Sequence, residues 1–261
     1  MLKRMGIVLV VLFVPLSLWG CVSMGPSGAK ASKEDSNTLH VYGPGGPLGP
    51  IEELAERFSK ETGIHVKVTA GPESKWIEDA KQDADLIYGG SEYMLRNLML
   101  NHPGLIDEKS KTELFPRAAG ILVRKGNPKN IQSLEDLTKS GIKIIDVNGA
   151  GQLGLWEDLA GRKGLIPGIS RNIDQSVTSS AEAIEIWKKN NKHDAWITYE
   201  SWHYRLADVT DLVKLPEEEK LYRGTPISIA ANSDQKKDAK QFIAFLKTET
   251  SRDVFQKWGW K

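Results

Sequence analysis

The sequence has a single cysteine among its 261 residues and an almost balanced charge, with 35 lysines and arginines against 34 acidic side chains. One cysteine excludes an internal disulfide. The lack of a long basic run argues against nucleic acid as a partner, because such partners are bound by clustered lysines and arginines. No apolar run reaches the roughly 20 residues that span a bilayer as a helix.

Signatures of catalysis and of metal binding are also missing. The five histidines are scattered, with no H-E-x-x-H pattern and no second cysteine, so no metal site is predicted. Residues 149–154 spell G-x-G-x-x-G, but they lie in mid-chain, and Asp174 stands at the start of its strand rather than at its end. A dinucleotide site is therefore the weaker alternative. We expect neither an enzyme nor a cofactor.

The N-terminus has the pattern of an export signal. Lys3 and Arg4 precede an apolar run of about a dozen residues, which ends in the letters LWGC. That ending resembles the bacterial lipobox, which implies lipidation of Cys21. We predict a signal peptide over 1–20 and a flexible tether over 21–37, because the tether is rich in small and polar residues with little to bury. The expected location is the periplasm or the cell surface, with membrane attachment through the lipid.

From Thr38 onward, predicted strands and helices alternate. Ile51, Leu54, Ala55 and Phe58 form one helical stripe, which Gly63 ends. Strands are predicted at 39–42, 64–69, 84–88, 120–124, 142–147, 173–178, 195–199 and 226–231, and helices near 51–62, 76–81, 92–99, 133–139, 155–162, 180–189 and within 236–261, with Pro167 in a loop. This alternation favours α/β architecture with mainly parallel sheets covered by helices.

Three predicted strands lead into glycine-rich loops, namely Pro44-Gly45-Gly46-Pro47, Gly89-Gly90-Ser91 and Asn148-Gly149-Ala150-Gly151. The carboxyl ends of parallel strands are where ligand crevices form. Bare backbone amides and the partial positive charge of a helix N-terminus attract anions. If the three loops converge, they form a pocket for a small anion. The alternative is that each loop is only a tight turn and that Ser91 caps its own helix.

Two groups of residues are candidates for holding the ligand. The backbone and hydroxyl donors are Gly45, Gly46, Ser91, Asn148 and Gly149. The cationic candidates are Arg117 and Arg223, each of which could instead form an ion pair at a hinge. The aromatic candidates Trp156, Tyr199 and Trp202 either wall the pocket or belong to the core. If they wall it, the ligand is larger than a bare oxyanion, such as an organic sulfonate, a phosphonate or a sugar acid.

Several long segments resemble one known group of proteins. These are "VYGPGGP", "GIHVKVTAGPESKWIEDAKQDADLIYGGSE", "PRAAGILVRKGNPKNI", "GLWEDLAGR", "DAWITYESW" and "AKQFIAFLKTETSRDVFQKWGWK". They resemble the AcfC-like (accessory colonization factor C) group of periplasmic solute-binding proteins, which is similar to the sulfate- and molybdate-binding proteins of ABC importers. The resemblance implies a type II periplasmic binding protein with two α/β lobes and a ligand cleft between them. We expect one lobe to hold 38–117 and about 230–261, and the other 118–229.

The function expected from these observations is binding without catalysis. A monomeric, lipid-anchored protein would capture a small anion, of the sulfate or molybdate kind, by closing its lobes, and would deliver it to an ABC permease or a membrane sensor. An organic anion is the first alternative. A host-interaction or adhesion role, suggested by the name of the group, is the second, and it predicts a large exposed patch with no enclosed polar pocket.

Overall fold

The computed structural model describes residues 37–261. The predicted signal peptide, Cys21 and all but the last residue of the predicted tether lie outside these residues. Among the described helices, none combines the length and the apolar character of a membrane span.

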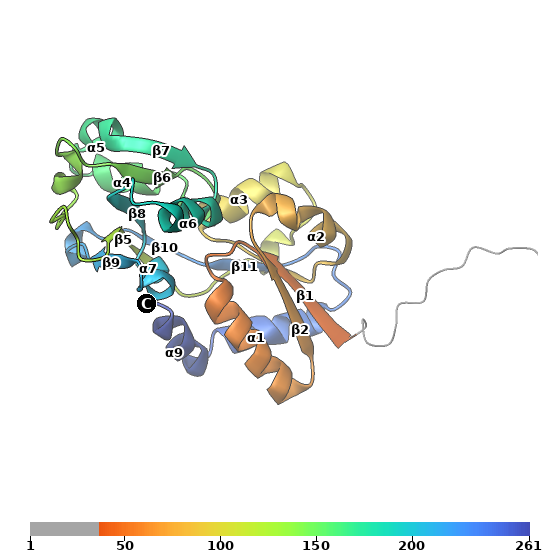
Figure 1. Ribbon diagram of the computed structural model, residues 1–261. Helices are drawn as coiled ribbons and strands as arrows, with labels where there is room; N and C mark the ends of the chain where they lie inside the picture. Colours follow the sequence, from red (N-terminus) through yellow and green to blue (C-terminus); the bar gives the residue numbers. More distant parts are fainter. Residues whose placement is uncertain (1–36) are drawn as a thin grey trace, which may run out of the picture. The chain divides into compact units, whose positions relative to one another are not determined.

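The first sheet has the strand order β2-β1-β3-β11-β4. Its strands are β1 (Thr38–Gly43), β2 (His65–Ala70), β3 (Leu86–Tyr88), β4 (Thr112–Glu113) and β11 (Pro226–Ile229). β1 pairs in parallel with β2 and β3, whereas β11 runs antiparallel to β3 and β4. We call this sheet and the helices packed on it the first lobe (Figure 1).

The second sheet has the order β10-β5-β8-β6-β7, with β9 also paired to β5. Its strands are β5 (Arg117–Arg124), β6 (Ile144–Val147), β7 (Ile173–Val177), β8 (Ala195–Tyr199), β9 (Thr210–Val213) and β10 (Tyr222–Arg223). β6 is parallel to β7 and β8, and β5 is antiparallel to β8, β9 and β10. This sheet with its helices is the second lobe.

Both sheets are therefore mixed, where the sequence predicted mainly parallel ones. The antiparallel strands β5 and β11 are those that follow the two connections between the sheets, after β4 and after β10. β11, which the sequence assigned to the end of the second lobe, pairs with β3 of the first.

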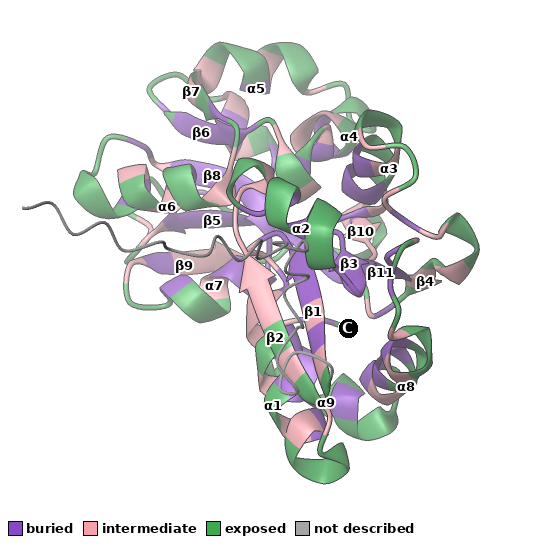
Figure 2. Cartoon of the chain, turned by 90° about the vertical axis from the view of Figure 1, so that its right-hand side faces the viewer, coloured by how far each residue is buried: buried purple, intermediate pink, exposed green. Residues whose placement is uncertain are grey.

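Helices cover the faces of each sheet. The first lobe carries α1 (Leu48–Thr62), α2 (Ile77–Asp83), α3 (Glu92–Asn101), α8 (Lys236–Leu246) and α9 (Glu249–Lys257), and the second carries α4 (Leu155–Gly161), α5 (Ile166–Asn172), α6 (Ser180–Lys189) and α7 (Ser201–Leu206). Single 3₁₀ turns are η2 (Glu73–Lys75), η3 (Glu108–Ser110), η4 (Glu135–Thr138), η5 (Ala150–Gln152) and η6 (Glu217–Glu219). Figure 2 shows that β1, β3, β5 and β8 are largely buried, that β2 is of intermediate burial, and that the outer faces of the helices are exposed.

Helix α1 forms for the reason that the sequence indicated. Ile51, Leu54 and Phe58 are buried on one face, where they pack with α8 and α9. Gly63 ends the helix in the left-handed conformation (φ 75°), and its N–H donates to the Ser59 carbonyl at 3.0 Å. The predicted helix end at Gly63 is confirmed.

Other predictions differ from the structure at short elements. Pro167 lies in the first turn of α5 rather than in a loop, because proline lacks the N–H that a first helical turn leaves unpaired. The helix predicted over 133–139 is only the 3₁₀ turn η4. The C-terminal region is two helices, since Thr248 caps the start of α9. The short elements β4, β9, β10 and α7 carry no periodic signal and were not predicted.

Candidate functional site

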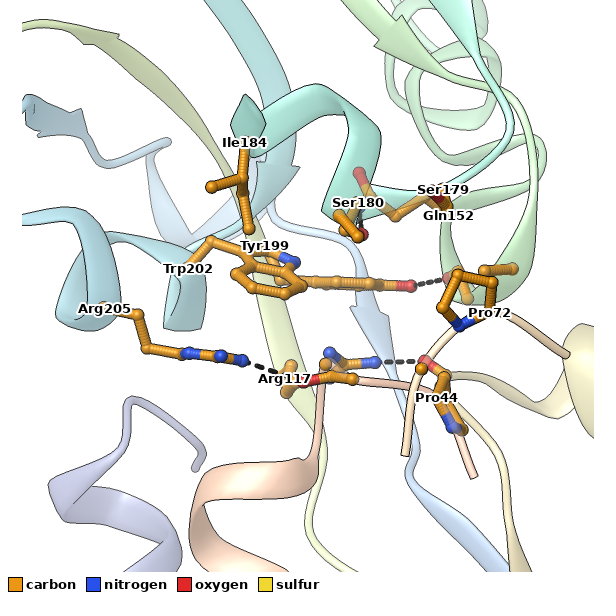
Figure 3. A pocket seen from close by; sticks show the side chains of 17 residues that line it. Pro44, Pro72, Arg117, Gln152, Ser179, Ser180, Ile184, Tyr199, Trp202 and Arg205 are labelled. Atoms are coloured by element: carbon orange, nitrogen blue, oxygen red, sulfur yellow. Dashed lines mark hydrogen bonds between the residues drawn. The ribbon is translucent and has the colours of Figure 1, made fainter. Parts of the chain in front are cut away.

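Loops from both lobes surround a cavity of about 130 Å³ (Figure 3). The first lobe contributes the loop after β1 and Gly90 after β3. The second contributes η5, which follows β6, and the first residues of α6. All three glycine-rich loops thus reach one cavity, although β1 and β3 belong to the first sheet and β6 to the second.

Two of these loops touch across the gap between the lobes. A Cβ atom added to Gly151 would lie 2.5 Å from the carbonyl oxygen of Gly90, and one added to Gly90 would lie 3.1 Å from the Gly151 Cα. Only glycine permits this approach, because a side chain at either position would meet backbone atoms. The two lobes therefore meet closely at this point of the cavity.

Arg117 is a buried cation in the wall of the cavity. It is the first residue of β5 and is 1% exposed. Its guanidinium donates a hydrogen bond to the Gly90 carbonyl, and its Nε has no hydrogen-bond partner. Within residues 37–261, no carboxylate lies within ion-pairing distance of it. Burial lowers the pKa of Arg117 from its ordinary value, and Tyr199 and Glu92 oppose that change.

A second arginine, which the sequence analysis missed, lines the same cavity. Arg205 of α7 is exposed, and its Nη1 donates to the Gly45 carbonyl at 2.8 Å (Figure 3). Its guanidinium carbon lies 4.9 Å from the centre of the Trp202 ring. The described residues that line the cavity include these two arginines and no aspartate or glutamate. The cavity therefore has a positive electrostatic character.

The aromatic candidates Tyr199 and Trp202 combine the two roles that the sequence left open. Each lines the cavity and also packs in the hydrophobic core of the second lobe. The Tyr199 hydroxyl donates to the Gly151 carbonyl, and burial raises the pKa of this phenol to about 12. The Trp202 Nε1 is buried and has no hydrogen-bond partner in the described part of the chain.

Neutral polar side chains line the cavity near the start of α6. Gln152 of η5 donates from Nε2 to the Ser180 hydroxyl at 2.7 Å, while its Oε1 is buried without a partner. Ser179 caps α6 by accepting from the Glu182 N–H. The helix N-terminus, with its partial positive charge, therefore opens toward the cavity.

Four predicted site residues lie away from this cavity or at its edge. Ser91 is 1% exposed, and its hydroxyl accepts from the Met94 N–H at 3.2 Å, so it caps α3 as the alternative interpretation held. Trp156 packs against the core of the second lobe. Asn148 and Gly149 line a second, adjoining cavity of about 550 Å³.

Arg223 forms an ion pair instead of lining the cavity. It contacts Asp158 of α4, and its guanidinium carbon lies 4.8 Å from the Tyr93 ring of α3. Since β10 is the last strand before the chain returns to the first sheet, this is the ion pair near a hinge that the sequence left open. In residues 37–261, no group of three or more His, Cys, Asp or Glu side chains lies close enough together to hold a metal ion.

Comparison with known proteins assigns the family. The model of the bacterial extracellular solute-binding protein family matches residues 39–261. The chain belongs to this family. A crystal structure of PEB3 with bound L-phospholactate matches this solute-binding protein with a TM-score of 0.79 and 30% identity, over 85% of this chain and 99% of that one. A structure of Peb3 from Campylobacter jejuni gives 0.78 and 30%, over the same shares.

Two more distant matches are a solved structure with the same fold and a protein with a similar sequence. The sulfate-binding protein SubI from Mycobacterium tuberculosis H37Rv is 20% identical over 86% of each chain, with a TM-score of 0.73. A Bacillus subtilis (strain 168) protein, "Putative ABC transporter substrate-binding lipoprotein YvgL", is 21% identical over 99% of this chain and 98% of its own length. The type II periplasmic binding protein fold, with two α/β lobes, is confirmed. Membership of the AcfC-like group within this family stays a prediction.

Proposed function

We propose that this solute-binding protein captures a small anion in the cavity between its lobes. The observation that carries the proposal is Arg117, a buried cation that lines the cavity and has no carboxylate partner in the described part of the chain. Removing an ion from water costs several kcal/mol even after the protein relaxes, unless a charge of opposite sign compensates it. An anionic ligand would supply that charge.

The surrounding groups favour the same ligand. Gly45 and Gly46 present a bare loop before α1, the N-terminus of α6 opens on the other side, and Arg205 adds a second positive charge. Hydrogen bonds from charged donors to an acid group are about twice as strong as those between neutral groups. Because these groups come from both lobes, a bound anion would stabilise the closed arrangement, which is the mechanism of capture that we propose.

Both a bare oxyanion of the sulfate or molybdate type and an organic anion fit this chemistry, and one observation favours the organic anion. A cavity of about 130 Å³ exceeds several-fold the roughly 10–15 Å³ that one water needs, and Ile184, Pro72 and Trp202 give it apolar walls. A bare oxyanion makes no use of such walls. PEB3, which this chain resembles, has been crystallised with an organic anion, L-phospholactate.

The remaining parts of the proposal concern location and partners. We propose a monomer of the AcfC-like group, anchored by lipid on Cys21 in the periplasm or at the cell surface, which delivers its ligand to an ABC permease or a membrane sensor. The relative named as a substrate-binding lipoprotein supports this assignment. An adhesion role predicts no enclosed polar pocket, and the cavity lined by Arg117 and Gln152 does not favour it.

A thermal-shift screen of the mature protein tests the proposal. The panel holds sulfate, molybdate, tungstate, phosphate, organic sulfonates, phosphonates and sugar acids, with neutral sugars and peptides for comparison. A ligand at one hundred times its Kd stabilises the native state by about 2.7 kcal/mol and raises the melting temperature. We expect one or more anions to raise it. A shift with a neutral sugar or a peptide, and with no anion, would overturn the proposal.

A further inference from the structure

The cavity around Arg117 continues into a larger one. The second cavity, of about 550 Å³, shares Gly71, Pro72, Ala150 and Ser179 with the first. Drug-sized ligands occupy pockets of about 300–1,000 Å³, a range that includes the second cavity and not the first. The site as a whole therefore has room for a ligand that extends beyond an acid group.

The second cavity is lined by neutral hydrogen-bonding side chains from both lobes. They are Ser74, Asn97 and Asn101 of the first lobe and Asn148 and Thr178 of the second. All five residues are exposed, and within residues 37–261 no side-chain hydrogen bond to another protein group involves them. Three amides and two hydroxyls, each able both to donate and to accept, are thus left for solvent or for a ligand.

The two cavities differ in charge. The described residues that line the second cavity include no lysine or arginine, and its one acid, Glu73, bonds to His102 at 2.9 Å. The first cavity has Arg117 and Arg205 and no acid. An elongated ligand with an acid group at one end would be oriented by this difference, with the acid at Arg117 and a neutral polar part among the asparagines.

We propose that the two cavities together bind a hydroxylated organic anion, such as a sugar acid or a sugar phosphate. The inference rests on the proposed function and deepens it. The acid group pairs with Arg117, and the hydroxyl groups exchange hydrogen bonds with Asn97, Asn101 and Asn148. We call the hydroxylated part of the ligand its tail, and the second cavity the tail site. Since α3 contacts η5 of the second lobe, a tail bound there touches both lobes and adds to the stability of the closed arrangement.

Calorimetric titration of the mature protein with matched probes tests this inference. The pairs are inorganic phosphate with glucose 6-phosphate, and acetate with gluconate, and glucose is the uncharged comparison. We expect the hydroxylated member of at least one pair to bind at least tenfold more tightly than its parent anion. Glucose should bind more weakly than either hydroxylated anion, because it lacks the group that pairs with Arg117.

A double variant measures the contribution of the second cavity to affinity separately from that of the acid group at Arg117. Asn97→Ala combined with Asn101→Ala removes two hydrogen-bonding groups, and we expect a loss of about tenfold in affinity for the hydroxylated anion. Affinity for phosphate or acetate should not change. Leu100→Ala, on the same helix at a residue that is 69% exposed and lines neither cavity, is the matched control and should bind like the parent. Equal melting temperatures would show that all variants fold.

The outcomes distinguish the two proposals. If parent and hydroxylated anions bind equally, or if the double variant binds the hydroxylated anion like the Leu100→Ala control, the tail site is overturned while anion binding stands. If no probe binds, the tail site is likewise overturned, and anion capture is decided by the wider panel of the thermal-shift screen. If glucose binds as tightly as the charged probes, anion capture itself is overturned, and the tail site with it.

Discussion

The guanidinium carbon of Arg117 lies 4.0 Å from the centre of the Tyr199 ring, and both side chains are buried where the loops of the two lobes meet. A desolvated cation over an aromatic ring gains about 2 kcal/mol. The guanidinium carbon of Arg117 also lies 5.1 Å from the centre of the Trp260 ring, and the guanidinium donates to the Gly90 carbonyl, so these contacts offset part of the several kcal/mol that an unpaired buried ion costs. Its charge has no carboxylate partner in residues 37–261.

The first prediction concerns the stability of the ligand-free protein. Replacing Arg117 by methionine keeps an unbranched chain of similar length and removes the buried charge, but it also removes the donor to the Gly90 carbonyl, so we expect these effects to nearly cancel and the free energy of unfolding to change by less than about 1 kcal/mol. Urea denaturation monitored by circular dichroism measures this, with an unchanged m value.

Arg124 provides the contrasting variant for that measurement. It donates hydrogen bonds to the carbonyls of His193 and Trp187 and lies 3.8 Å over the Trp187 ring. Arg124→Met should destabilise the protein by about 2 kcal/mol, because two carbonyls lose a charged donor. A loss of similar size for Arg117→Met would mean that Arg117 is structural.

The second prediction uses the glycine loop before α1. A Cβ at position 46 would lie 3.1 Å from Nη1 of Arg117 and 3.8 Å from Cζ2 of Trp202, whereas a Cβ at position 45 would meet nothing within 4 Å. Gly46→Val should lower the affinity for the anion found in the screen by tenfold or more, and Gly45→Val should lower it less. Calorimetric titration measures both, and equal losses would argue against a ligand beside Arg117.

The third prediction concerns the contact between the lobes. Because the carbonyl of Gly90 leaves no room for a side chain at position 151, Gly151→Ala must move the two loops apart. We expect weaker anion binding and, in small-angle X-ray scattering with saturating anion, a larger radius of gyration than that of the parent. Gly161→Ala, whose Cβ would meet only Ile166 at 3.5 Å, is the control. An unchanged radius for Gly151→Ala would show that the loops need not touch when the ligand is bound.

The fourth prediction concerns pH. Burial lowers the pKa of His193 below its ordinary value of about 6.5, against the opposing effect of Asp174. At a pH between the pKa of His193 in the native protein and its pKa in the unfolded chain, the unfolded chain binds more protons than the native one. The stability that His193 contributes is therefore fully present above about pH 6.5 and decreases as the pH falls below it. Urea denaturation at pH 7.5 and 5.5, each about one unit from 6.5, should show a larger decrease for the parent than for His193→Gln. Equal decreases would contradict the assignment.

Much of the site could be predicted from the sequence, because it follows from the ends of strands. Gly45, Gly46 and the loop before α4 stand directly after predicted strands, and the carboxyl ends of neighbouring parallel strands meet at one edge of a sheet. Arg117 was a candidate because it stands where the chain crosses between lobes. The packing that buries it without a partner could be seen only in the fold.

The rest could not be predicted, for physical reasons that differ between residues. Arg205 belongs to the six-residue helix α7 and bonds to Gly45, which is 160 residues away, so no local pattern marks it. Trp156 and Trp202 look alike in the sequence, since apolar patterning shows that a side chain is buried but not whether it faces a core or a cavity. From the sequence, Ser91 could equally bind a ligand or cap α3, and only the hydrogen bond that it accepts from the Met94 N–H distinguishes the two.

If Arg117 binds the acid group of a ligand, its replacement must weaken binding, and isothermal titration of the parent and of Arg117→Met with the anion identified by the screen measures this. Truncating one member of a buried charge pair costs about 2–5 kcal/mol of binding energy. We expect a loss of thirtyfold or more, which is about 2 kcal/mol, in a variant whose stability is little changed. An affinity that stays within about threefold of the parent would contradict it.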